Sequence, residues 1–87
     1  MKTCEKNHTI TPPKTQYPEF SERLKIAMAI RQYTVEDLAI RTHTSQSTIS
    51  MYRSGKRLPN IEILRLIAKE LRVSSDYLLG LSDFIFV

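Results

Sequence analysis

Apolar side chains recur at three- and four-residue steps along most of the chain, a pattern that predicts amphipathic helices. One such segment runs from about Pro18 or Glu19 to Gln32, and another from Ile61 to Arg72. The expected inward residues are Phe20, Leu24, Ala27, Met28 and Arg31 in the first segment, and Ile61, Leu64, Ile67, Ala68 and Leu71 in the second. Arg31 is expected to contribute only its aliphatic stem. The chain is therefore predicted to be all-α.

Two shorter helices are expected between these segments, joined by a polar turn. Thr34 stands before acids that include Asp37, so a hydroxyl N-cap precedes negative charge in the first turn, where the helix dipole favours it. Ser45 supplies a second N-cap, and Gly55 ends the helix that follows. The inward residues of this second helix are Ile49 and Tyr52.

A last short helix completes the domain. Asn60 caps the helix that follows Pro59, and Ser74 or Ser75 caps a final helix that Gly80 stops. The pattern predicts a compact five-helix domain over residues 19–81.

Positive charge is concentrated around the two short helices. The formal net charge is +4, and no acid lies between Asp37 and Glu62. The cations in that interval are Arg41, Arg53, Lys56 and Arg57. Such local charge is the electrostatic footprint of a nucleic-acid-binding element.

These features resemble a known family. The segments TVEDLA, SQSTIS, SGKR and LPNIEILRLIAKELRVSSDYLLG are similar to the lambda-repressor/Cro-like (Xre-type) helix-turn-helix DNA-binding family, and the likeness covers roughly residues 20–81. It implies an all-α, five-helix lambda-repressor-like domain that binds double-stranded DNA through its helix-turn-helix.

The second short helix carries the candidate base contacts. Its outward positions are Gln46, Ser47 and Ser50. Gln pairs with the adenine edge, and Ser hydroxyls pair with several bases. The resemblance places base contacts at these three positions and at Met51. Two roles stay open for Met51: contact with a thymine methyl group, or a place in the core.

Phosphate contacts are expected from the two helix starts, whose free N–H groups suit anions, and from the flanking cations. The candidates are Thr34, Arg41, Ser45, Thr48, Arg53, Lys56 and Arg57.

The chain departs from the family at two places. The family often has an apolar residue, Gly and an apolar residue in the turn, where this chain has Thr42, His43 and Thr44, so His43 is expected at positive φ. The family often has Gln at Val35, reaching both phosphate and the recognition helix. DNA affinity is then expected to rest more on Arg41 and the basic loop.

The ends of the chain carry separate expectations. Residues 1–18 are predicted to be a flexible tail, either a floppy terminus or a basic arm that uses Lys2, Lys6 and Lys14. Residues 82–87 form an apolar tail, for which packing on Ile26 and Ile30 is predicted, in the same chain or across a twofold axis. The candidate dimer contacts are Ile26, Ile30, Phe84 and Phe86.

The sequence lacks the motifs that would indicate other classes of protein. No nucleophile–base pair, paired carboxylates or metal cluster has usable spacing, so no enzyme, cofactor or metal is expected. Cys4 is the only cysteine and is expected to be an inert thiol. No apolar run approaches the roughly 20 residues that span a bilayer, and no secretory signal is apparent. We therefore expect no membrane partner and a cytoplasmic location.

The sequence predicts a sequence-specific transcriptional regulator, of phage- or prophage-repressor type, that reads the major groove as a homodimer. Two alternatives of the same fold stay open: an antitoxin, and an interaction module whose main partner is a protein.

Overall fold

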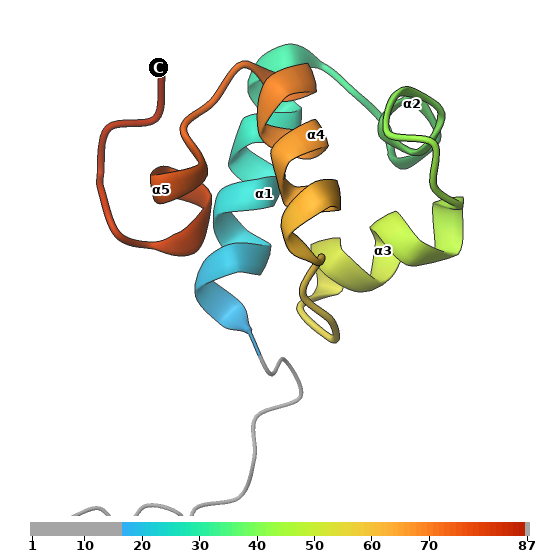
Figure 1. Cartoon of the computed structure of the whole chain (residues 1–87), viewed down its shortest axis with the longest axis horizontal. Coiled ribbons are helices and arrows are strands. Elements are labelled where there is room, and N and C mark those ends of the chain that lie inside the picture. The colour runs from blue at the N-terminus through green and yellow to red at the C-terminus, as the bar shows by residue number, and fades with distance from the viewer. Residues whose placement is uncertain (1–16, 87) are drawn as a thin grey trace, which may run out of the picture.

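Five helices account for most of residues 17–86, which are the residues that the computed structural model describes (Figure 1). They are α1 (Pro18–Arg31), α2 (Val35–Arg41), α3 (Gln46–Ser54), α4 (Ile61–Leu71) and α5 (Ser75–Leu79). The predicted all-α, five-helix class is confirmed. The hypotheses on Lys2, Cys4, Lys6 and Lys14 lie outside the described residues.

Side-chain caps begin four of these helices. The capping residues are Thr34, Ser45, Asn60 and Ser74. At α2 the cap is reciprocal, because Thr34 Oγ1 accepts from the Asp37 N–H at 3.1 Å and Asp37 Oδ2 accepts from the Thr34 N–H at 3.0 Å. The bond from the Thr34 backbone, with a smaller contribution from its hydroxyl, lowers the pKa of Asp37 below its ordinary value of 3.8. Helix α1 begins instead with Pro18, which has no N–H to satisfy.

The core forms around α1, which packs against α3, α4 and α5. In Figure 1, α5 and the C-terminal segment lie on one side of α1, and α2 and α3 lie on the other. The buried apolar residues are Phe20, Leu24, Ala27, Met28, Leu38, Ala39, Ile49, Tyr52, Ile67, Leu71, Val73, Tyr77 and Leu78. The inward stripe predicted for α1 is therefore confirmed at its four apolar positions.

The expectation for Arg31 was wrong. Its Nε donates to the Leu71 carbonyl oxygen at 2.6 Å, and Nη2 donates to the Arg72 carbonyl oxygen at 3.4 Å. Carbonyls at the end of a helix lack partners within that helix. The guanidinium of Arg31 thus caps the end of α4, in addition to any packing of its stem.

The expectation for Ile61 was also wrong, since this side chain is 85% exposed. Helical periodicity gives the direction of a side chain around the helix axis, but not how far along that axis the neighbouring helices extend. Ile61 is the first residue of α4 and remains uncovered there, whereas Ile67 and Leu71 in later turns are buried.

The C-terminal segment folds back on the domain. Val73 and Phe86 form an antiparallel bridge, and the Ser74 N–H donates to the Ile85 carbonyl oxygen at 2.7 Å. The Ile85 side chain packs against the core, while the Arg31 guanidinium lies 5.7 Å from the Phe86 ring centroid.

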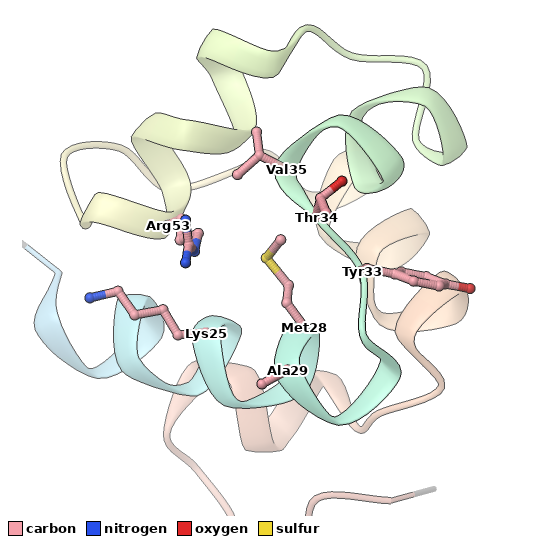
Figure 2. A pocket seen from close by; sticks show the side chains of 7 residues that line it. All are labelled: Lys25, Met28, Ala29, Tyr33, Thr34, Val35 and Arg53. Atoms are coloured by element: carbon pink, nitrogen blue, oxygen red, sulfur yellow. The ribbon is translucent and has the colours of Figure 1, made fainter.

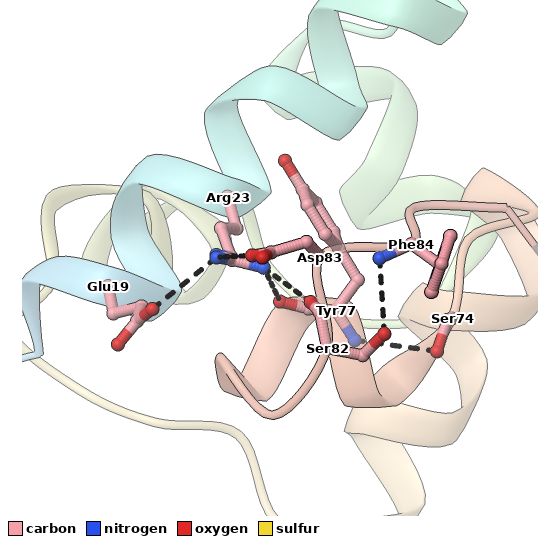
Figure 3. A network of polar contacts seen from close by, with 7 residues as sticks. All are labelled: Glu19, Arg23, Ser74, Tyr77, Ser82, Asp83 and Phe84. Carbon is pink, nitrogen blue, oxygen red and sulfur yellow. Dashed lines mark hydrogen bonds and ion pairs between the residues drawn. The ribbon is translucent and has the colours of Figure 1, made fainter.

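Arg23 of α1 binds the start of the C-terminal segment through hydrogen bonds and an ion pair (Figure 3). Its Nη1 donates to the carbonyl oxygens of Tyr77 at 3.1 Å and Ser82 at 2.6 Å. Its Nη2 lies 3.0 Å from Asp83 Oδ1 and 3.5 Å from Glu19 Oε2, and the guanidinium lies 4.5 Å from the centroid of the Tyr77 ring. One side chain therefore joins α1, α5 and the C-terminal segment.

Candidate nucleic-acid interface

Helices α2 and α3 pack against each other across a four-residue turn, Thr42 to Ser45. Leu38 and Ala39 of α2 and Ile49 and Tyr52 of α3 are buried, so each helix presents its remaining sides outward. The two helices and the turn form a helix-turn-helix.

The polar turn is satisfied by its own hydroxyls. Thr42 is fully buried, and its Oγ1 donates to the Leu38 carbonyl oxygen at 2.8 Å. Thr44 Oγ1 lies 2.9 Å from Thr42 Oγ1, and the Thr44 N–H donates to the Ala39 carbonyl oxygen. A buried hydroxyl with a partner costs little, which explains why Thr is tolerated here. His43 has φ 59°, as predicted.

The outward side of α3 presents short polar groups. Gln46, Ser47 and Ser50 are exposed. Ser47 Oγ lies 3.1 Å from Ser45 Oγ, whereas within residues 17–86 the side chains of Gln46 and Ser50 have no hydrogen-bond partner. Their donors and acceptors are available to a ligand.

Ser45 and Thr48 hold the start of α3. Ser45 Oγ accepts from the Thr48 N–H at 3.1 Å and lies 2.8 Å from Thr48 Oγ1. Met51, further along, is half-buried. Half-burial is compatible with both a place in the core and contact with DNA, so base contact by Met51 stays a prediction.

The predicted cations differ in their surroundings. Arg53, Lys56 and Arg57 are exposed, and none of their side chains has a partner within the described part of the chain. Arg41 instead lies 3.6 Å from Glu70 of α4 and stacks on Tyr33 at 4.5 Å from the ring centroid. Three of the four cations are therefore free to meet an anion.

Lys25 of α1 was missed by the sequence analysis. Together with Arg53 it lines a hollow of about 300 Å³ between α1, the start of α2, and α3 (Figure 2). The other lining residues are Met28, Ala29, Tyr33, Thr34 and Val35. The sequence carries no signal for this placement, because Lys25 belongs to a solvent-facing position of an amphipathic helix and meets α3 only in the folded chain.

The candidate dimer contacts belong to α1 and to the C-terminal segment. Ile26 and Ile30 of α1 are each 44% exposed, and Phe84 and Phe86 of the C-terminal segment are 83% and 56% exposed. Their apolar surface is open, and their contact across a twofold axis stays a prediction.

The fold and this surface define a class: a helix-turn-helix domain with a polar recognition helix and flanking cations. The helix-turn-helix family profile matches residues 24–78. The chain belongs to the lambda-repressor/Cro-like (Xre-type) helix-turn-helix family, a class of DNA-binding transcriptional regulators.

A curated relative is the HTH-type transcriptional activator BcrR of Enterococcus faecalis, 37% identical over 67 residues. The match covers 77% of this chain and 33% of that protein, so the chain spans about a third of the length of its relative. Among the residues described, no helix has the length and apolarity needed to cross a membrane.

Proposed function

We propose that this chain is a sequence-specific transcriptional regulator that binds double-stranded DNA by inserting α3 into the major groove. The observation that carries the proposal is the exposed side of α3. There Gln46 and Ser50 offer polar groups beside the cations Arg53, Lys56 and Arg57, and none of these side chains has a partner within residues 17–86. Polar groups on a helix read base edges, and flanking cations hold phosphates. Such a regulator acts where the genome is, which in a bacterial cell is the cytoplasm.

The phosphate contacts are assigned to two groups of residues. The N-cap residues Thr34 and Ser45, with Thr48, stand at helix starts. Arg53 lies in the last turn of α3, and Lys56 and Arg57 follow that helix. Arg41 contributes less to phosphate binding than the other cations in this assignment, because its guanidinium already pairs with Glu70 and stacks on Tyr33.

Selection of duplexes from a random library, followed by titration of the winner, tests the proposal. Gln46→Ala is expected to weaken binding to the winner by about 1–3 kcal/mol and to leave binding to random DNA unchanged. Arg57→Ala is expected to weaken both equally and to lower the salt slope by about one.

Arg65→Ala is the matched control for Arg57→Ala. Arg65 pairs with Glu62 on the solvent side of α4, at 2.7 Å, away from α3. Equal effects of Gln46→Ala on selected and random duplexes would show that α3 does not read the bases.

The dimer is the second part of the proposal. A symmetric regulator reads two half-sites roughly 34 Å apart. The exposed apolar side chains that we assign to contact with a second copy are Ile26, Ile30, Phe84 and Phe86. Replacing Phe84 and Phe86 by Ser is expected to lower self-association in sedimentation and to reduce binding to a palindrome more than to a half-site. Unchanged self-association would favour a different protein as the occupant of this surface.

The sign of regulation follows from where the operator lies. Binding over a promoter occludes it, so we propose repression for such operators, while the relative from Enterococcus faecalis is an activator. A reporter with the selected operator placed over or upstream of a promoter distinguishes the two signs.

A further inference from the structure

Lys25 and Arg53 face each other across the groove between α1 and α3. Besides the hollow of about 300 Å³ described above, they line a second, shallower one of about 310 Å³, whose other lining residues are Ser50 and Ser54. In Figure 2, Lys25 extends along the mouth from α1, and Arg53 points into the same opening from α3. Two elements far apart in the sequence thus bring two cations to one place.

The charge at this place is not compensated by its walls. Among residues 17–86, no carboxylate lines either hollow. Lys25 pairs with its helix neighbour Glu22, whose Oε2 lies 3.9 Å from Nζ, and both side chains are exposed. Exposed pairs of this kind hold a cation weakly. Two neighbouring cations that lack a shared anion repel each other, and an anion placed between them removes that repulsion.

The position of the hollows indicates which anion fits. Ser50 lines the second hollow and also belongs to the exposed side of α3 that the proposed function assigns to the bases. If α3 reads bases as proposed, the duplex backbone beside those bases would pass over this groove. Val35, the α2 side chain that lines the first hollow, is a hydrocarbon and offers a phosphate no hydrogen bond.

We propose that Lys25 and Arg53 together clamp one backbone phosphate of the DNA duplex. This inference rests on the proposed function and adds to it a residue of α1. The clamp sets the position of α3 along the groove, because phosphate contacts fix register and orientation while base contacts read the sequence.

Titration of the selected duplex with single and double variants tests the clamp. Lys25→Gln and Arg53→Gln are each expected to weaken binding about three- to fivefold and to lower the salt slope by about one. The double variant is expected to lose less than the product of the two effects, because both side chains serve the same phosphate. Lys25→Arg is expected to retain binding, and Glu22→Gln to strengthen it.

Lys69→Gln is the control for charge alone, since Lys69 lies in the last turn of α4 and lines a different hollow with Ser75, the first residue of α5. A scan with single neutral methylphosphonate linkages then locates the phosphate. One linkage per half-site is expected to weaken wild-type binding, to weaken Lys25→Gln binding less because Arg53 still contacts that phosphate, and to have no effect on the double variant.

Each outcome separates the two proposals. A wild-type chain that selects no duplex overturns both. If a duplex is selected but Lys25→Gln binds it as tightly as wild type does, only the clamp is overturned. The same holds if Lys25→Gln and the control Lys69→Gln lose equal affinity for that duplex. Lys25-dependent stabilisation by inorganic phosphate, together with additive Lys25 and Arg53 effects on DNA, would assign the groove to a free anion and overturn the clamp.

Discussion

The backbone of His43 sets the path of the chain between α2 and α3. With φ at 59°, it occupies the left-handed region, which costs a residue with a side chain roughly 1–2 kcal/mol relative to its preferred conformations. Glycine adopts this region freely. The hydrogen bonds of Thr42 and Thr44 offset this conformational cost, because they fix the turn on both sides of His43.

Replacing His43 by Gly is therefore expected to stabilise the domain by about 0.5–1 kcal/mol, the relief of strain being partly offset by the larger entropy of glycine in the unfolded chain. Chemical denaturation measures the change. Glu36→Gly inside α2 is the control and should destabilise by about 1 kcal/mol. A destabilised His43→Gly variant would show that the side chain contributes contacts that outweigh the strain.

At the scale of elements, capping decides where the helices begin. Thr34, Ser45, Asn60 and Ser74 each place a side-chain oxygen against backbone N–H groups of the following turn. Each bond satisfies a donor that the helix itself cannot satisfy. The start of α3, which holds the side chains proposed to read bases, depends on Ser45 in this way.

The carboxylate of Asp37 makes the α2 cap sensitive to acid. Its pKa is lowered in the folded chain by the hydrogen bonds from Thr34, so the folded state binds the proton more weakly than the unfolded state does. The contribution is fully present above the unfolded pKa and is lost as the pH falls through the folded value. The difference in unfolding free energy between wild type and Asp37→Asn is therefore expected to shrink below about pH 4.

Ser45→Ala is the matched control for that experiment. It removes a hydroxyl cap with no titrating group, so its cost of about 1 kcal/mol should stay constant over the same pH range. A gap between wild type and Asp37→Asn that widened on acidification would contradict the assigned direction of the Asp37 pKa shift.

On the scale of the whole molecule, two arginines of α1 tie the domain together. Arg31 caps the end of α4, and Arg23 joins α5 to the C-terminal segment. Each guanidinium group donates to two main-chain carbonyls, which the several planar N–H donors of arginine make possible.

Arg23→Gln is expected to destabilise the domain by about 1–3 kcal/mol, because hydrogen bonds from a charged donor to the carbonyls of Tyr77 and Ser82 are lost. Arg23→Lys should rescue little, since an ammonium lacks the planar fork. Asp83→Asn is the control, expected to cost less than about 1 kcal/mol because the Asp83 carboxylate is 97% exposed. Thermal unfolding of the three variants measures their losses of stability. Equal losses for Arg23→Gln and Asp83→Asn would contradict this prediction.

The sequence by itself determined the helices and the chemistry of the recognition helix. Caps such as Thr34 and Ser45, stops such as Gly55, and the inward stripe of α1 act over a few neighbouring residues, so the local order of residues contains them. The predicted exposure of Gln46, Ser47 and Ser50 followed from the inward positions of Ile49 and Tyr52 in the same helix.

The tertiary structure decided which distant groups meet. Arg41 faces Glu70, Arg31 caps α4, and Lys25 shares a groove with Arg53 because α1 crosses α3 and α2 lies beside α4. The exposure of Ile61 likewise depends on where its neighbours end. Helix periodicity specifies which side of a helix is buried, whereas the crossing of helices results from packing summed over the whole core, which no local pattern contains.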